Sequence, residues 1–122
     1  MNYTAKTLSP VLPVEDMNRA ITFYRDVLGF AAMVESTEYT VMQRGGATVH
    51  LTKAASEEVL TALRGRVSIY LEVENIADLW ASVSQLKGKY RIRDLFDQSY
   101  GMREFHIVDP DGCLVFVGEE IL

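Results

Sequence analysis

Few side chains in this sequence have the chemistry of a catalyst, and they are widely spaced. Imidazole titrates near neutrality, so His50 would exchange protons with the carboxylate of Glu72 if the fold brought the two together. Cys113 lies in an apolar run without a neighbouring base, which indicates a buried, unreactive thiol. The sequence lacks a Ser-His-Asp order, a glycine-rich phosphate loop and a paired cysteine motif. These patterns predict no catalytic residue.

The charge balance bears on possible partners. Seventeen acidic against twelve basic residues give a formal charge of −5, which disfavours nucleic acid because phosphate binding needs clustered Lys and Arg. One basic concentration, formed by Lys87, Lys89, Arg91 and Arg93, is typical of a solvated loop or an edge strand. We therefore expect no nucleic-acid partner.

Length and hydropathy limit the organisation of the chain. A chain of 122 residues with 48% hydrophobic side chains fits one domain over residues 1–122. No run of eighteen apolar residues is present, so we expect no membrane span. A single cysteine and an N-terminus without the apolar stretch of a secretion signal favour a cytoplasmic location.

Apolar residues recur with helical spacing in two places. Residues 16–28 carry one such stripe, with Asp16 as candidate N-cap and Gly29 just after its end. A second stripe runs from Ile76 to Leu86, with Asn75 as candidate N-cap and Gly88 after it. A short connecting helix is predicted over residues 56–64.

The entrances to the two long helices repeat each other. The sequence VEDM at positions 14–17 matches VENI at positions 73–76, an offset of 59 residues (73 minus 14). The chain therefore contains two copies of one unit, at about 6–54 and 66–120. Strand-like segments flank each helix, at residues 8–14, 31–35, 39–43, 47–53, 67–73, 90–93, 102–108 and 113–117.

One hairpin turn in each unit and one longer loop in the second unit complete the pattern. Gly45-Gly46 and residues 109–112 (DPDG) carry hairpin-turn chemistry, and residues 94–101 are predicted as a loop. The result is an α+β fold of two βαβββ units. Each sheet has one face covered by its helix and one open face. If the open faces curve together or meet a second subunit, they enclose a cup lined by alternate strand residues.

Two stretches carry a family resemblance. Residues 11–16 (VLPVED), followed by 23–30 (FYRDVLGF), strongly resemble the opening unit of the vicinal oxygen chelate superfamily, which includes glyoxalases, extradiol dioxygenases and bleomycin resistance proteins. Residues 101–105 (GMREF) and 109–112 resemble its closing hairpin. The resemblance implies paired βαβββ units that form curved mixed sheets around a ligand cup. These motifs belong to the scaffold and leave the chemistry open.

The resemblance also identifies four positions that hold a metal ion in the metal-using members. They are occupied here by Ser9, His50, Ser68 and Phe116. One imidazole, two hydroxyls and a phenyl ring do not supply the roughly three ligands that a divalent cation needs. We therefore predict no metal and no cofactor, and we interpret His50 as a hydrogen-bonding residue of the cup wall.

Without a metal, the sequence resembles the bleomycin resistance branch, to which residues 39–45 (YTVMQRG) are also similar. The resemblance implies a homodimer that sequesters an amphipathic, antibiotic-like small molecule, either neutral or cationic. The alternative is a glyoxalase- or dioxygenase-type enzyme, a lyase or isomerase with an atypical site.

Strand alternation from His50 and Phe116 sets the expected lining of the cup. Arg103 is placed near the rim as the available partner of Glu72, and His106 is expected on the helix side of its sheet. The predicted ligand-binding residues are Ser9, Tyr39, His50, Ser68, Tyr70, Glu72, Arg103, Phe105 and Phe116.

Overall fold

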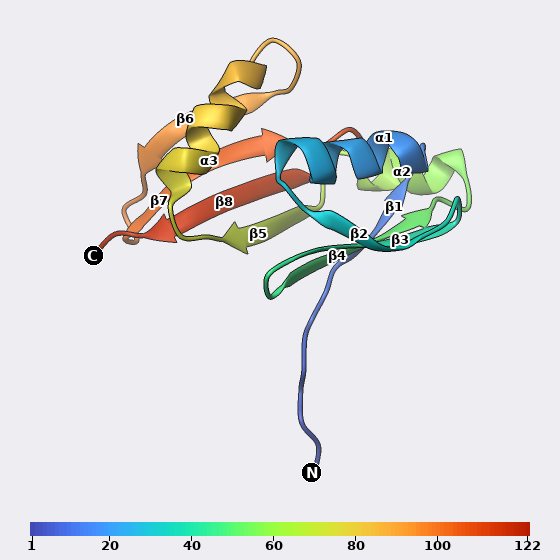
Figure 1. Cartoon of the computed structure of the whole chain (residues 1–122). Coiled ribbons are helices and arrows are strands. Elements are labelled where there is room, and N and C mark those ends of the chain that lie inside the picture. Colours follow the sequence, from blue (N-terminus) through green and yellow to red (C-terminus); the bar gives the residue numbers. More distant parts are fainter. The chain divides into compact units, whose positions relative to one another are not determined.

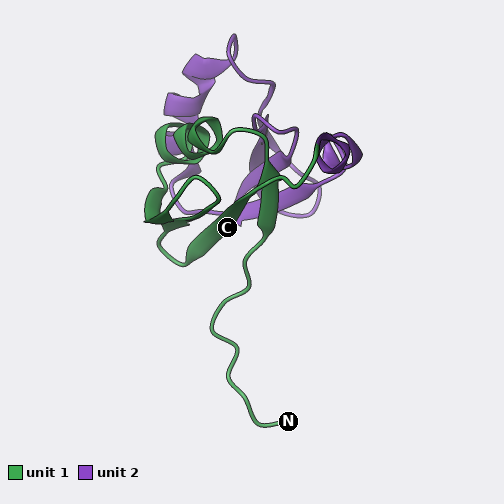
Figure 2. Cartoon of the chain, turned by 90° about the vertical axis from the view of Figure 1, so that its right-hand side faces the viewer, with its two compact units in different colours: residues 1–56 green, residues 57–122 purple.

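The computed structural model describes all 122 residues, which form two compact units at residues 1–56 and 57–122 (Figure 2). Each unit contains one four-stranded sheet (Figure 1). The strand orders are β1-β4-β3-β2 and β5-β8-β7-β6, so the second unit repeats the first. In both sheets the first pair is parallel and the other two pairs are antiparallel. The predicted α+β fold of two βαβββ units is confirmed.

The first unit follows the predicted boundaries closely. Its elements are β1 (Val11–Val14), α1 (Met17–Thr22), the π-helical turn η1 (Phe23–Val27), β2 (Ala31–Glu35), β3 (Tyr39–Arg44) and β4 (Ala47–Lys53). Asp16 caps α1, because its Oδ1 accepts the Arg19 N–H at 3.2 Å. Gly29 follows the helix with a φ of 77°, in the left-handed region that glycine adopts without strain.

The second unit starts with an additional helix. Its elements are α2 (Glu57–Leu63), β5 (Ser68–Glu72), α3 (Ile76–Val83), the 3-10 turn η2 (Ser84–Leu86), β6 (Ile92–Asp97), β7 (Met102–Val108) and β8 (Leu114–Glu120). The short connecting helix predicted from the sequence corresponds to α2.

The start of α3 differs from the prediction. Asn75 adopts a left-handed backbone with a φ of 59°, and its side chain makes no capping hydrogen bond. The Glu119 carboxylate on β8 accepts the backbone N–H groups of Asn75 and Ile76 instead, at 2.8 and 3.2 Å. A residue 44 positions away in sequence thus supplies the cap, which local capping rules do not foresee.

Two of the last three strands, β6 and β8, extend beyond their predicted ends. Residues 94–97, predicted as part of a loop, continue β6, because a register shift between Arg93 and Phe96 lets the strand keep pairing with β7. Such a bulge breaks the alternation of side chains from which a strand is predicted. β8 likewise extends three residues beyond its predicted end at position 117, and Glu120 pairs with Met102.

Side chains alternate between two faces of each sheet. In the first unit the buried face, against α1, consists of Leu12, Val14, Met42, Val49 and Leu51. In the second unit α3 lies across β7 and β8 (Figure 1), and the buried face consists of Phe105, Ile107, Val115 and Val117. We call the opposite faces, turned away from α1 and α3, the open face of the first unit and the open face of the second unit.

Candidate ligand-binding site

The open face of the first unit carries the predicted residues of its strands. Val41 lies directly opposite His50, as the two-residue turn at Gly45-Gly46 requires. Tyr39 belongs to the same face, and its hydroxyl lies 2.7 Å from His50 Nδ1, with the two rings edge to face. The hydroxyl of Ser9, just before β1, hydrogen-bonds to that of Thr48. The predicted common face for Ser9, Tyr39 and His50 is confirmed.

The open face of the second unit carries aromatic rings across neighbouring strands. Ser68, Tyr70 and Glu72 alternate along β5, and Tyr70 lies opposite Phe116 on β8. The Tyr70 and Phe116 rings are nearly parallel, with an interplanar angle of 20° and centroids 6.1 Å apart. Such a pair presents flat apolar surface on which a planar ligand is able to stack.

The prediction for β7 is wrong by one residue. Phe105 faces α3, where it is 0% exposed and its ring centroid lies 5.3 Å from that of Trp80. His106 occupies the open face instead, opposite Phe116, with ring centroids 4.2 Å apart. The cause is the connection between β7 and β8, which joins the pair Val108 and Leu114 through five residues, 109–113. Even-numbered residues of β7 therefore face even-numbered residues of β8.

Arg103 is the second corrected residue. It shares the orientation of Phe105 along β7, on the face toward α3. Its guanidinium makes a bidentate ion pair with Asp97, in which Nε donates to Oδ1 at 2.7 Å and Nη2 donates to Oδ2 at 3.2 Å. Glu72 is exposed on the open face, so Arg103 is not the partner that the sequence suggested. The same one-residue phase error explains both corrections.

Glu104 forms the main polar centre of the open face of the second unit, and the sequence analysis missed it. The residue is 0% exposed, and its carboxylate accepts four side-chain hydrogen bonds. The donors are Tyr70 Oη and Tyr100 Oη, each at 2.7 Å, His106 Nε2 at 2.9 Å and Gln98 Nε2 at 3.3 Å. A buried carboxylate is tolerated when donors replace its hydration in this way.

The pKa values of this cluster follow from the same contacts. Burial raises the pKa of Glu104, but the hydrogen bonds from His106, Tyr100, Tyr70 and Gln98 outweigh it and lower that pKa to about 2. Burial and the hydrogen bond to Glu104 raise the pKa of Tyr70. The hydrogen bond to Glu104 likewise raises the pKa of Tyr100. At neutral pH the carboxylate is therefore ionised and both phenols keep their protons.

Gly118 makes room for this cluster. It lies on β8 beside Glu72 on one side and Glu104 on the other. A Cβ atom at this position would lie 2.0 Å from Tyr70 Oη and 2.8 Å from Tyr70 Cζ. A glycine is therefore required for the Tyr70 hydroxyl to cross β8 and reach Glu104. A glycine inside a strand is the sequence signal that points to such a close approach.

The four positions that hold a metal in the metal-using members of the superfamily that the sequence resembles do not supply a ligand set here. Ser9 is bonded to Thr48, and His50 Nδ1 to the Tyr39 hydroxyl. Ser68 and Phe116 offer a hydroxyl and a hydrocarbon ring. No group of three or more His, Cys, Asp and Glu side chains converges anywhere in the chain. The residues present do not fit a divalent cation, which needs about three such ligands.

Two further features lie outside the open faces. Cys113 is buried, and burial together with Asp109 and Asp111 raises the pKa of its thiol to about 12, so it is not a nucleophile at neutral pH.

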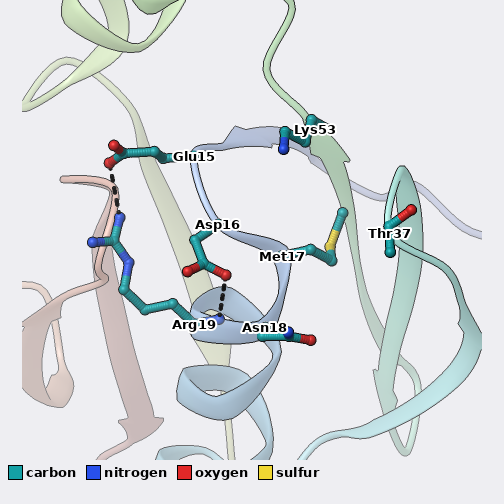
Figure 3. Close-up of a pocket in the computed structure, with 7 residues that line it drawn as sticks. All are labelled: Glu15, Asp16, Met17, Asn18, Arg19, Thr37 and Lys53. Carbon is teal, nitrogen blue, oxygen red and sulfur yellow. Dashed lines mark hydrogen bonds and ion pairs between the residues drawn. The ribbon is translucent and has the colours of Figure 1, made fainter.

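A cavity of about 430 Å³ lies at the start of α1 (Figure 3), lined by Glu15, Asp16, Met17, Asn18, Arg19, Thr37 and Lys53. Its carboxylates serve the helix itself, since Glu15 pairs with the Arg19 guanidinium at 3.3 Å and Asp16 provides the cap.

The two four-stranded sheets of equal strand order, each with one open face, define the fold class of this chain as paired βαβββ units. Residues 3–117 match the family model of the Glyoxalase/Bleomycin resistance protein/Dioxygenase superfamily. The chain is 30% identical to the bleomycin resistance proteins of Geobacillus stearothermophilus and Staphylococcus aureus, over 92% of this chain and 95% of theirs. The chain therefore belongs to this superfamily, as its sequence motifs predicted.

Solved structures show the same fold. The bleomycin resistance determinant encoded on the transposon Tn5 superposes with a TM-score of 0.78 at 22% identity, covering 97% of this chain and 100% of that one. A bleomycin-binding protein complexed with bleomycin superposes with a TM-score of 0.77 at 23% identity, covering 95% and 99%. No helix of the present chain has the length and apolar character needed to cross a membrane.

Proposed function

We propose that this chain binds an amphipathic, antibiotic-like small molecule without reacting with it, and acts by sequestration. The observation that carries this proposal is the set of accessible aromatic rings on both open faces. Tyr39 is 38% exposed and Tyr70 is 47% exposed, although both belong to strands of a folded sheet. Rings beside hydrogen-bonding groups are typical of small-molecule sites. The names of the bleomycin resistance proteins with which the chain shares 30% identity support the same function.

The proposed contact residues are those that lie on the open faces: Ser9, Tyr39, His50, Ser68, Tyr70, Glu72 and Phe116. Each aromatic ring contributes on the order of 0.5 to 2 kcal/mol when it stacks on a planar or cationic group. A glyoxalase- or dioxygenase-type reaction is the alternative. It is not favoured, because three of the four positions for metal ligands hold Ser9, Ser68 and Phe116, and Cys113 is buried.

We also propose that the protein is a cytoplasmic homodimer in which residues 1–122 act as one domain. An open sheet face needs a cover, and β2, at the edge of its sheet, carries the exposed apolar residues Met33 and Val34. The acidic charge of −5 would raise the local concentration of a cationic ligand. Light scattering at micromolar concentration tests the dimer, and a monomeric mass would contradict it.

Calorimetric titration with bleomycin tests the binding function. Tyr39→Ala is expected to weaken binding about fivefold, because one stacking contact of about 1 kcal/mol is lost. Tyr3→Ala is the matched control, since this exposed tyrosine precedes β1. Denaturing the complex and measuring the mass of the released drug separates sequestration from catalysis. An altered drug mass, or the absence of binding by the parent protein, would overturn the proposal.

A further inference from the structure

The basic residues between positions 87 and 93 fall into two groups. Lys87 Nζ pairs with Asp94 Oδ1 at 2.6 Å, and Lys89 Nζ lies 5.7 Å from the Tyr90 ring centroid. Arg91 and Arg93 make no ion pair. Arg93 lies opposite His106, and the Arg91 carbonyl accepts the Val108 N–H at 3.0 Å, which continues the same register. Both arginines therefore occupy the open face of the second unit.

A third arginine joins them from a distant part of the sequence. Arg64 follows α2 and packs against the turn between β7 and β8, where Gly65 N–H donates to the Gly112 carbonyl at 3.0 Å. A Cβ atom at Gly112 would lie 2.6 Å from Arg64 Cγ, and the φ of Gly112 is 85°. Only glycine fits this position without strain, so the turn itself is shaped to admit Arg64.

Arg64, Arg91 and Arg93 line one cavity of about 660 Å³. The volume lies within the range of roughly 300 to 1,000 Å³ that small-molecule sites occupy. Apolar side chains complete the lining, among them Val108 and Leu114. His106, whose ring packs against that of Phe116, also lines the cavity. The cavity is therefore continuous with the open face on which Phe116 and Tyr70 lie.

The charge of this cavity is opposite to that of the whole chain. None of the three guanidinium groups is in an ion pair, and Arg93 lies over the Phe96 ring, with its guanidinium carbon 3.7 Å from the ring centroid. Asp109 is the one carboxylate in the lining, and its Oδ1 accepts the backbone N–H groups of Asp111 and Cys113 at 2.9 Å. Three positive charges thus face one negative charge, within a protein whose net charge is −5.

We infer that this cavity binds an oxyanion group of the ligand, such as a sulfonate, carboxylate or phosphate, while the aromatic body of the ligand lies toward His106 and Phe116. The inference rests on the proposed binding function and adds the chemical class of one end of the ligand. Guanidinium groups suit this task because their planar fork matches two oxygens of an oxyanion. Glu72 is exposed on β5, at the opposite edge of the sheet from Arg93 on β6. Its carboxylate is available to a cationic group at the other end of the ligand.

The test compares three probes that share one ring and differ in charge. Naphthalene-2-sulfonate, 2-naphthylmethanol and 2-naphthylmethylammonium are titrated into the full chain, with binding followed by calorimetry and by ¹H–¹⁵N NMR. The sulfonate is expected to bind about tenfold more tightly than the alcohol, with shifts at Arg91, Arg93 and the turn at residues 109–112. Arg91→Gln/Arg93→Gln is expected to abolish this preference.

The matched control is Arg25→Gln/Arg103→Gln, which removes the same charge from exposed arginines paired with Asp26 and Asp97. It is expected to leave the preference intact. Equal binding of the three probes, or equal loss in both double variants, would overturn the inference. So would inorganic phosphate that binds as tightly as the sulfonate, because the ring would then contribute nothing. In the first two cases binding of bleomycin would still support the proposed function, whereas failure of every probe and of bleomycin would remove both.

Discussion

The two open faces derive from one duplicated unit, yet they organise polar groups in different ways. In the first unit Tyr39 and His50 form one exposed hydrogen-bonded pair, and Ser9 and Thr48 form a second pair that is partly buried. In the second unit four donors from three segments converge on the buried carboxylate of Glu104. An exposed pair keeps access to water, whereas a buried carboxylate depends on every donor. The first face is therefore adaptable, and the second is organised in advance.

Removal of Glu104 should have the largest effect on stability. Glu104→Ala leaves four donors without their acceptor and opens space beneath the aromatic rings, so we expect a loss of about 3 kcal/mol or more in the free energy of unfolding. His50→Ala on the other face should cost under about 1 kcal/mol, because its partner Tyr39 remains in contact with water. Urea denaturation of both variants measures the contrast. Equal losses would show that the two faces do not differ in this way.

The stability that the buried carboxylate of Glu104 contributes should depend on pH. The pKa of Glu104 is lowered to about 2 in the folded state, so its contribution to stability is present above its unfolded pKa of roughly 4.3. That contribution is lost as the pH falls toward about 2. The difference in unfolding free energy between the parent chain and Glu104→Gln should therefore shrink between pH 5 and pH 2. Urea midpoints across this range measure it, and a constant difference would be incompatible with the lowered pKa.

A methyl group at Gly118 should separate Tyr70 from Glu104. Gly118→Ala would place its Cβ 2.0 Å from the Tyr70 hydroxyl oxygen, and we expect a cost of about 2 kcal/mol. The cost should be smaller in a Tyr70→Phe background, where the hydroxyl is absent. Gly46→Ala is the control in the other unit, since nothing lies within 4 Å of the added carbon. Thermal unfolding of Gly118→Ala, Tyr70→Phe, the double variant and Gly46→Ala measures these costs. If the double variant lost as much stability as the two single variants together, the proposed clash would be excluded.

The smallest effect should come from the exposed pair. Tyr39→Phe removes the hydrogen bond of 2.7 Å to His50 Nδ1 but keeps the ring, so stability should fall by about 0.5 kcal/mol. Tyr100→Phe is the matched change on the other face, because it removes one of the four donors to Glu104. It should cost about 1.5 kcal/mol, since its acceptor is charged and buried. A denaturation midpoint of Tyr39→Phe that lies below that of Tyr100→Phe would contradict the comparison.

The fold could be predicted from the sequence because its signals are local and occur twice. The helical stripes, the repeated entrance at positions 14–17 and 73–76, and the turn at Gly45-Gly46 all act within a few residues. The face of the first sheet was predicted correctly for the same reason, since a two-residue turn sets the register of β3 against β4. The roles of these residues in ligand binding remain predictions.

The residues on the open face of the second unit could be predicted only in part from local sequence patterns. Strand periodicity gave Tyr70 and Phe116, but the five-residue connection at 109–113 reversed the expected orientation of Phe105, Arg103 and His106. The donors Gln98 and Tyr100 both lie in residues 94–101, which were predicted as a loop, so no local pattern linked them to Glu104.

By itself, the sequence determined the α+β class, the duplicated unit and the unsuitability of Ser9, Ser68 and Phe116 as metal ligands, because residue type and period are properties of the chain. The tertiary structure alone decided which side of β7 faces α3, that Glu119 caps a helix in place of Asn75, and that Arg64 meets Arg91 and Arg93 around one cavity. These features depend on strand register and on contacts between distant segments. A shift of one residue changes the face of every side chain in a strand, and local patterns do not encode that choice.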